Sequence, residues 1–458
     1  MKRKKKAARR GSTTVPQVVV IKGAEVLTLD AQERRGRLDL RIEEGRIAAM
    51  GEKVPTRGVT RVIDAKGLVA LPGFVQIHVH LCQTLFRAQA EEMELLDWLR
   101  ERIWPMEGAL EVPEMRASAR LGIAELLLSG TTTILDMGSV RHTDALFAQA
   151  EALGIRYVGG KTIMDRGQGY PAGLRETTEE AIHESTRLCA RWHGQAGGRL
   201  RYAFSPRFVL SASEEAVRAC VHEARRTGAL LHTHSSENAE EVALVRERTG
   251  MGNVEYLHSL GFSGPDVVLA HGVWLSPQER ALLRETRTRI AHCPTANLKL
   301  ASGIARVDEL LAEGVHVGLG ADGAPCSNGL DAFAPMRLAA LLHKVRGGPK
   351  AIPATQALRL ATVAGAQALG LDDVGTLEVG KRADIQLLDL RRPHVWPPQG
   401  DLAARIVHSG RPSDVHTVLV DGRVLVDAGK LVVADVAKIL REAERATTTL
   451  RRRALIDA

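Results

Sequence analysis

The sequence predicts an α/β protein: a (β/α)₈ TIM barrel with a small β-sandwich domain formed from both chain ends. Between residues 70 and 371, eight short β-branched segments alternate with amphipathic helical segments, which is the pattern of a barrel. On either side, residues 13–69 and 372–435 hold short strand-like segments separated by turns. A doubly wound open sheet is the alternative, because periodicity alone does not show that the strands close into a barrel.

Each predicted barrel strand is followed by a segment with helical periodicity and readable helix ends. Ser276 and Glu279 form a capping box with Pro277 at the first helical position, and we expect Ser211 to begin a second box whose helix ends at Gly228. The predicted strands span residues 71–80, 132–137, 156–164, 200–205, 229–234, 267–271, 289–292 and 316–320.

The two flanks are predicted to pair into one small domain. Asp421-Gly422 is a hairpin turn signal between two apolar runs in the second flank. Residues 436–458 are predicted to form a C-terminal helix, and residues 1–12 a basic, disordered tail.

The net charge of +8 is concentrated in that tail. Seven Lys and Arg and no acidic residue lie within residues 1–12, so the remaining chain carries 8 − 7 = +1. The rest of the chain is nearly neutral, and only 3% of the residues are aromatic, which argues against specific nucleic-acid binding. The tail alone could bind a polyanion. The chain also lacks an apolar run long enough to span a membrane, and no h-region of a signal peptide follows the basic start.

The five cysteines are dispersed and never occur as C-x-x-C. This distribution argues against a disulfide framework and against a structural thiolate zinc site, so we expect a cytoplasmic protein.

Histidine and acidic side chains follow the predicted strands at the end where barrel enzymes carry their reacting groups. The first strand ends in a His-x-His pair whose two side chains share one face, since strand residues i and i+2 point the same way. Three histidines with one aspartate suit a zinc-type divalent ion that activates water. The residues at these strand ends are His78, His80, His232, His234, Glu237, His271 and Asp322.

Several longer motifs make the chain resemble the amidohydrolase superfamily between about residues 17 and 435. The branch is the one that holds methylthioadenosine/S-adenosylhomocysteine deaminases, guanine deaminases and triazine hydrolases. Within it, the chain is most similar to the 5′-deoxyadenosine deaminase group, formerly labelled N-ethylammeline chlorohydrolase. The motifs are Pro72-Gly73-Phe74, the run from His78 to Arg87, His292-Cys293-Pro294, Asn297 to Gly303, and Gly320 to Asn328.

The resemblance implies one divalent metal ion, zinc or else iron, held by His78, His80, His234 and Asp322. His232 is the alternative to His234, and the His-x-x-Glu spacing favours His234. Binuclear relatives carry a lysine at the end of the fourth strand. This chain has Ser205-Pro206-Arg207 there, so a mononuclear site is expected.

The resemblance also implies catalytic roles. Asp322 would take the proton from the metal-bound water, His271 would orient the resulting hydroxide, and Glu237 would protonate the ring nitrogen beside the amino-bearing carbon. This is acid–base catalysis with a metal-activated nucleophile.

The substrate-binding residues implied in the same way are Gln83, Trp98, Arg207 and Glu237. Gln83 and Arg207 match positions that contact the purine in guanine deaminases, whereas methylthioadenosine deaminases more often have histidine at the Arg207 position. Both side chains could instead hold a ligand or a carboxylate in place. Trp98 could cover the pocket, and Trp104 is better explained as a core residue.

These observations predict a zinc-dependent aminohydrolase that converts an adenosine-type nucleoside to its inosine analogue and ammonia. The predicted substrates are 5′-deoxyadenosine, methylthioadenosine, S-adenosylhomocysteine and adenosine. Guanine deaminase and s-triazine hydrolase are the alternatives within the class, and a catalytically dead barrel with a binding role is the alternative outside it. We expect a small heterocyclic substrate as partner, no membrane association, and a homo-oligomer, either a dimer or a tetramer.

Overall fold

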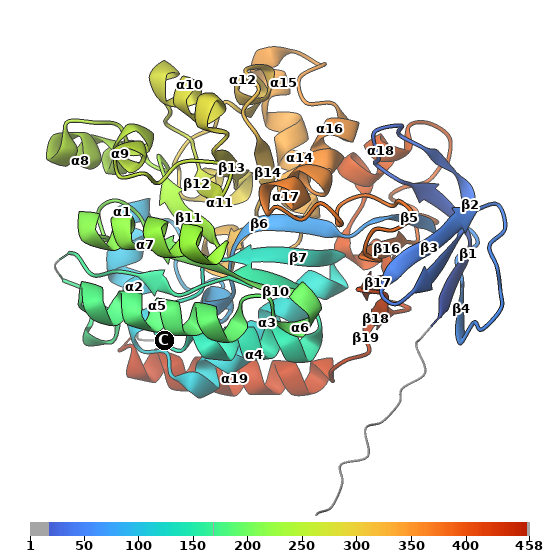
Figure 1. Ribbon diagram of the computed structural model, residues 1–458, viewed down its shortest axis with the longest axis horizontal. Coiled ribbons are helices and arrows are strands. Elements are labelled where there is room, and N and C mark those ends of the chain that lie inside the picture. Colours follow the sequence, from blue (N-terminus) through green and yellow to red (C-terminus); the bar gives the residue numbers. More distant parts are fainter. Residues whose placement is uncertain (1–17, 168, 456–458) are drawn as a thin grey trace, which may run out of the picture.

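The computed structural model describes residues 18–167 and 169–455, and a barrel of parallel strands lies at its centre (Figure 1). All eight predicted barrel strands are present, and each pairs in parallel with the next along the chain. Their bounds are β6 (Phe74–His80), β7 (Thr131–Asp136), β8 (Arg156–Gly159), β10 (Leu200–Pro206), β11 (Leu230–Ser235), β12 (Val267–His271), β13 (Arg289–His292) and β14 (Val317–Leu319), with short β9 (Thr162–Ile163) beside β10.

The barrel closes at β15 (Asp322–Gly323), which continues β14 after two residues and pairs with β6. Asp322 lies opposite Val79 in this pairing. Gly320 allows the close approach, because a Cβ at this position would lie 2.6 Å from the carbonyl oxygen of His78. The closed barrel therefore brings Asp322 beside the His-x-His pair, and the open-sheet alternative is excluded.

Helices cover the outside of the barrel (Figure 1), and the main ones follow the strands in sequence. They are α3 (Val112–Leu128), α4 (Thr143–Leu153), α5 (Thr178–Trp192), α7 (Glu214–Thr227), α8 (Ala239–Thr249), α9 (Asn253–Ser259), α10 (Pro277–Thr286), α12 (Val307–Ala312), α14 (Phe333–Leu342), α16 (Ala354–Leu360) and α17 (Val363–Ala368). Shorter helices are α1 (Leu95–Trp98), α2 (Trp104–Gly108), α11 (Pro294–Lys299), α13 (Ala324–Ser327) and α15 (Lys344–Gly347).

The helix ends confirm one capping prediction and correct another. At α10 the Ser276 hydroxyl accepts from the Glu279 N–H at 3.1 Å, and the Glu279 carboxylate accepts from the Ser276 N–H at 2.9 Å. The cap of α7 is Ser213 and not Ser211 as predicted. Asp165 decides this, because its carboxylate accepts from both the backbone N–H and the hydroxyl of Ser213. The predicted end of α7 at Gly228 is confirmed.

The predicted β-domain from both chain ends is also confirmed, and its strands hydrogen-bond into one nine-stranded mixed sheet. β5 joins the two halves of the sheet, because it pairs with β1 in parallel and with β16 antiparallel. Asp421-Gly422 forms the predicted hairpin turn. The strands are β1 (Val19–Leu27), β2 (Arg35–Glu43), β3 (Arg46–Gly51), β4 (Arg61–Asp64), β5 (Val69–Pro72), β16 (Ile385–Leu388), β17 (Val415–Val420), β18 (Arg423–Asp427) and β19 (Lys430–Leu431).

A buried ion-pair network ties this sheet to the barrel. Arg156, at the start of β8, donates to the Asp384 carboxylate at 2.7 and 3.0 Å and to Asp421 at 2.5 Å. Breaking one partner of such a buried network typically costs about 3–5 kcal/mol, so the sheet and the barrel depend on one another for stability.

The C-terminal helix α19 (Val436–Arg453) runs along the barrel and packs on α3 (Figure 1). Arg453 at its end bonds to the Ala109 carbonyl at 2.7 Å and to Glu114 at 3.2 Å. The predicted basic tail of residues 1–12 lies outside the described residues, and the division into domains at residues 70 and 371 stays a prediction.

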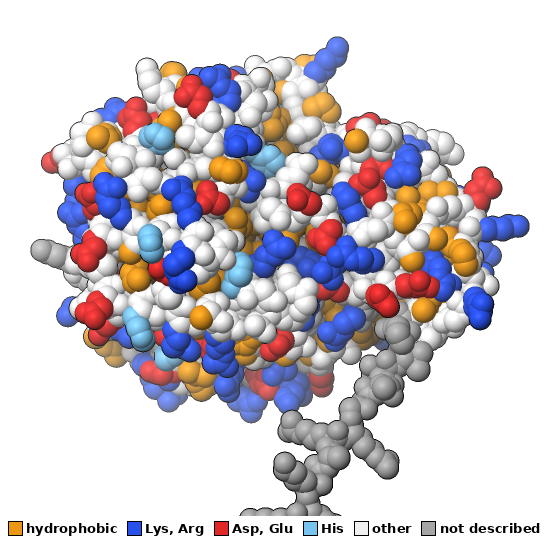
Figure 2. Space-filling model, viewed as in Figure 1, with side chains coloured by type: hydrophobic (Ala, Val, Ile, Leu, Met, Phe, Trp, Pro, Cys, Tyr) orange, Lys and Arg blue, Asp and Glu red, His pale blue; other side chains and the backbone are white. Residues whose placement is uncertain are grey.

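Basic and acidic side chains are interspersed on the face of the molecule seen in Figure 2, which agrees with the nearly neutral charge of the chain beyond its first residues. None of the helices within residues 18–167 and 169–455 is both long and apolar enough to cross a lipid bilayer.

Candidate metal centre and active site

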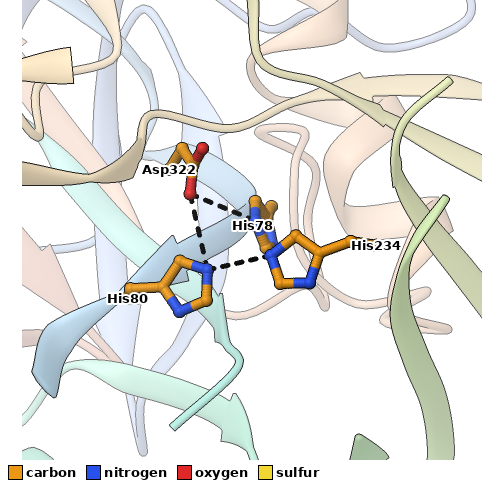
Figure 3. Close-up of side chains that lie close together, drawn as sticks. All are labelled: His78, His80, His234 and Asp322. Atoms are coloured by element: carbon orange, nitrogen blue, oxygen red, sulfur yellow. Dashed lines mark hydrogen bonds and ion pairs between the residues drawn. The ribbon is translucent and has the colours of Figure 1, made fainter. Parts of the chain in front are cut away.

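Four side chains meet at the carboxyl end of the barrel strands (Figure 3). His78 and His80 come from the end of β6, His234 from β11 and Asp322 from β15. Their candidate ligand atoms all lie within 4.8 Å of one another. Asp322 Oδ1 is 3.2 Å from His78 Nε2 and 3.4 Å from His80 Nε2, and His80 Nε2 is 3.1 Å from His234 Nε2.

The structure brings His234 into this cluster and leaves His232 outside it. His234 points its Nε2 at His80, and its Nδ1 donates to the Arg207 carbonyl at 2.7 Å. His232 lies behind the cluster, with its Nε2 at 2.8 Å from His78 Nδ1. Burial lowers the pKa of His232 to about 4, so this ring is neutral at physiological pH.

The donor set fits a divalent metal ion. His78 Nε2 is buried, has no hydrogen-bond partner within the described part of the chain, and faces a carboxylate oxygen. A cation between them would satisfy both atoms. Burial, together with the neighbouring rings, holds the pKa values of His78, His80 and His234 well below the usual range, which keeps the imidazoles in the neutral form that binds metals. Three imidazoles and one carboxylate form a set suited to zinc.

A second group adjoins the first and shares Asp322 with it. His271, at the end of β12, places its Nε2 3.5 Å from Glu237 Oε2 and 3.9 Å from Asp322 Oδ2. Burial alone would lower the pKa of His271. The negative charges of Glu237 and Asp322 have the larger combined effect, so the pKa of the ring is raised. Burial raises the pKa of Glu237 to about 7, so that this carboxyl can hold or release a proton near neutral pH.

Buried side chains to which the sequence analysis gave no role in the site hold this second group in place. Glu241 accepts from the Glu237 N–H at 2.9 Å, and burial raises the pKa of Glu241 to about 7 as well. Asn297 Oδ1 lies 2.9 Å from His271 Nδ1. Glu241 lies on α8, four residues after Glu237, and the sequence signal that could have pointed to it is this second acid close behind the first.

A pocket opens onto the cluster, and all four residues predicted to bind substrate line it, namely Gln83, Trp98, Arg207 and Glu237. Apolar side chains form much of the remaining wall: Leu95, Leu99, Phe208 and Leu300. Trp104 does not line the pocket. It packs edge-on against Tyr170 with ring centroids 4.6 Å apart, as expected of a core residue.

Glu107 is the main residue that sequence reasoning missed. It is buried on α2, and its carboxylate accepts from Arg207 Nη1 at 2.5 Å and from Gln83 Nε2 at 2.7 Å. Gln83 and Arg207 therefore share one acidic partner behind the pocket wall, while Gln83 Oε1 is left without a hydrogen-bond partner in the described chain. In the sequence, Glu107 could have been noticed as the one acidic residue of the otherwise apolar segment 103–110.

Comparisons with known proteins agree with this geometry. The chain is 39% identical over 442 residues to a 5′-deoxyadenosine deaminase from Methanosarcina acetivorans, which covers 95% of this chain and 99% of the relative. An adenosine deaminase from Xanthomonas campestris, solved with bound zinc, superimposes with a TM-score of 0.88 at 27% identity and covers 95% of this chain and 98% of that one.

An atrazine chlorohydrolase from Arthrobacter aurescens, solved in complex with zinc, is equally similar in structure. Its TM-score is 0.88 at 29% identity, and the match covers 94% of this chain and 100% of that chain. Residues 69–425 match the amidohydrolase family model. On the strength of its barrel, its His/Asp cluster and these matches, the chain belongs to the amidohydrolase family.

Proposed function

We propose that this chain is a zinc-dependent aminohydrolase that converts an adenosine-type nucleoside and water to the inosine analogue and ammonia. The observation that carries the proposal is the meeting of His78, His80, His234 and Asp322 beside the buried acid Glu237 in one pocket. The relationship to a 5′-deoxyadenosine deaminase over nearly the whole chain supports the choice of substrate class.

The four ligands would hold the ion at the carboxyl end of the barrel. A divalent ion bound by such a set acidifies water and so supplies a hydroxide nucleophile at neutral pH. Asp322 would accept the proton of the attacking water, which is supported by its position: Oδ1 faces the ligand histidines and Oδ2 faces His271. His271 is held by Asn297 and lies between two carboxylates, so it can orient the nucleophile.

Glu237 is the proton donor to the substrate. Water would add to the ring carbon that bears the amino group as Asp322 takes one of its protons, and Glu237 would give its proton to the adjacent ring nitrogen, which makes that carbon electrophilic. The amino group would then take up the proton that Asp322 accepted from the water, the carbon–nitrogen bond would break as the added hydroxyl gives its proton to Glu237, and ammonia would leave. A carboxyl group with a pKa of about 7 is suited to this role, because it can give and regain a proton at physiological pH.

Gln83, Trp98 and Arg207 would bind the heterocycle. The apolar wall formed by Leu95, Leu99 and Leu300 suits the faces of a planar ring, and Gln83, which also lines the pocket, has a buried Oε1 with no hydrogen-bond partner in the described chain. The second candidate is a guanine-type substrate, favoured by the presence of Gln83 and Arg207 together in the wall. An s-triazine is a third candidate, supported by the likeness to the atrazine chlorohydrolase.

The proposal is tested by measuring ammonia release from the zinc-loaded protein. The panel is 5′-deoxyadenosine, methylthioadenosine, S-adenosylhomocysteine, adenosine, guanine and an aminotriazine. We expect the highest kcat/KM with one of the four nucleosides. A preference for guanine or the triazine would overturn the substrate class, and the absence of turnover with every compound would overturn the enzyme assignment.

The cytoplasmic location and the homo-oligomer expected from the sequence stay predictions. Size-exclusion chromatography with light scattering on the full chain would give the oligomeric state.

A further inference from the structure

His232 is a buried histidine on β11 that belongs to neither group of candidate ligands, yet both of its ring nitrogens are engaged. Nδ1 lies 2.8 Å from the carbonyl oxygen of Val268 on the neighbouring strand β12, and Nε2 lies 2.8 Å from His78 Nδ1. The side chain has no exposed surface. The β-pairing of His232 with Val268 fixes this arrangement in the sheet.

The hydrogen-bond partners of His232 and His78 determine which ring nitrogen of each carries a proton. A carbonyl oxygen can only accept, so the Val268 carbonyl requires a proton on His232 Nδ1. In the neutral ring His232 Nε2 is then an acceptor, and the proton between the two rings belongs to His78 Nδ1. His78 Nε2 is therefore left with its lone pair directed at the ligand cluster, where it lies 3.2 Å from Asp322 Oδ1.

We propose that His232 is a positioning residue for the metal centre: it holds His78 in the tautomer and ring orientation in which Nε2 can bind a divalent ion. The inference rests on the metal site of the proposed function. It gives His232 a task distinct from that of His234, which lies two residues further along the same strand and contributes its own Nε2 to the cluster.

The opposite tautomer of His78 would place a proton on Nε2 and block metal binding at that nitrogen. Partners that orient a metal-bound histidine commonly change metal affinity by about 10–100-fold when they are removed. In this chain the partner is a second imidazole, whose own direction is set by one backbone carbonyl. Loss of the His232 acceptor should therefore weaken metal binding without removing a ligand.

Two amide variants separate the two hydrogen bonds of His232. In His232→Asn the amide lies near the position of Nδ1, so it can still donate to the Val268 carbonyl but does not reach His78. In His232→Gln the amide oxygen lies near the position of Nε2 and can accept from His78 Nδ1. His232→Leu removes both bonds. His292→Leu is a matched control, because His292 is also a buried histidine at a strand end and has no hydrogen-bond partner in the described chain.

The measurement is the zinc dissociation constant of each purified, full-length variant, obtained by competition with a chromophoric chelator. The visible spectrum of the cobalt-substituted protein serves as a second readout. We expect His232→Asn and His232→Leu to bind zinc about 10–100-fold more weakly than wild type, and His232→Gln to lie close to wild type. The control His292→Leu should keep the wild-type affinity.

Equal affinities of the Asn, Gln and wild-type proteins would overturn the inference, and this comparison holds even if the Leu variant does not fold. Failure of the wild-type protein to bind zinc would instead overturn the proposed metal site itself. A wild type that binds zinc but releases no ammonia would overturn the proposed reaction and leave the role of His232 intact.

Discussion

His78 Nε2 lies 3.2 Å from Asp322 Oδ1, and both atoms are hydrogen-bond acceptors in the arrangement that their other partners impose. Two acceptors buried against each other, with 0% and 7% of their side chains exposed, repel one another unless a cation lies between them. A cation bound between them would therefore add to the stability of the barrel as well as to the proposed chemistry.

Zinc should therefore raise the melting temperature of metal-free protein. Binding to the folded state alone adds RT ln(1 + [L]/Kd), or about 2.7 kcal/mol when free zinc is 100-fold above its dissociation constant. The measurement is thermal unfolding of chelator-treated protein across a zinc titration. Asp322→Ala should show a much smaller shift, because it lacks one ligand. Identical melting curves with and without zinc would contradict the site.

Glu237→Gln should abolish turnover and keep the metal. The amide cannot give a proton to the ring nitrogen, and positioned acids typically contribute about 10²–10⁴-fold, so kcat should fall by at least about 100-fold. Zinc content should stay unchanged, because Glu237 is not one of the four ligands. Glu240→Gln, an exposed neighbour on the same segment, is the matched control. Near-normal activity of Glu237→Gln would refute the assigned acid.

The reaction should slow as the pH rises through about 7. Glu237 works in its protonated form, and burial raises the pKa of Glu237 to about 7, so the competent fraction of free enzyme falls above that pH. The measurement is kcat/KM between pH 5 and 9 at saturating zinc. A profile that stays flat from pH 6 to 9 would show that the proton comes from another group.

Glu237→Gln should also stabilise the metal-free fold at neutral pH. The carboxyl has an ordinary pKa of 4.5 when unfolded and one of about 7 in the fold, so the unfolded state loses its proton first as the pH rises. The wild type therefore loses stability between pH 4.5 and 7, by about 3 kcal/mol in total, and the amide variant does not. Thermal unfolding of both proteins at pH 4.5 and 7.5 checks this: the difference should be small at the lower pH and large at the higher. The opposite order would contradict the burial of a proton-binding group at this position.

Substitutions of Arg207 and Glu107 should change the free energy of unfolding non-additively. Arg207→Met leaves the buried Glu107 carboxylate with the Gln83 hydrogen bond but without its cationic partner, and removal of one partner of a buried pair typically costs about 3–5 kcal/mol. The double variant Arg207→Met/Glu107→Gln removes the stranded charge and should recover much of that loss. Chemical unfolding of the two single variants and the double variant measures the coupling, and additive losses would contradict it.

The sequence determined features that depend on neighbouring residues. The period of a strand places His78 and His80 on one face of β6, and the Ser276 box and the Asp421-Gly422 turn mark a helix start and a hairpin. Strand ends in a barrel gather at one rim, and so the order of the motifs was enough to assemble the candidate ligands.

Tertiary structure decided what depends on contacts across the barrel. His232 is not among the candidate ligands because its ring contacts His78, which lies 154 residues earlier in the chain. The N-cap of α7 is Ser213 rather than Ser211 because Ser213 donates to Asp165, 48 residues earlier. The role of Glu107 was hidden for the same reason, since its partner Arg207 is 100 residues distant. Tautomers, buried ion pairs and a raised carboxyl pKa arise from burial and from which group faces which. Neither burial nor the facing group can be inferred from a local sequence pattern, because both are set by contacts that form when the barrel closes.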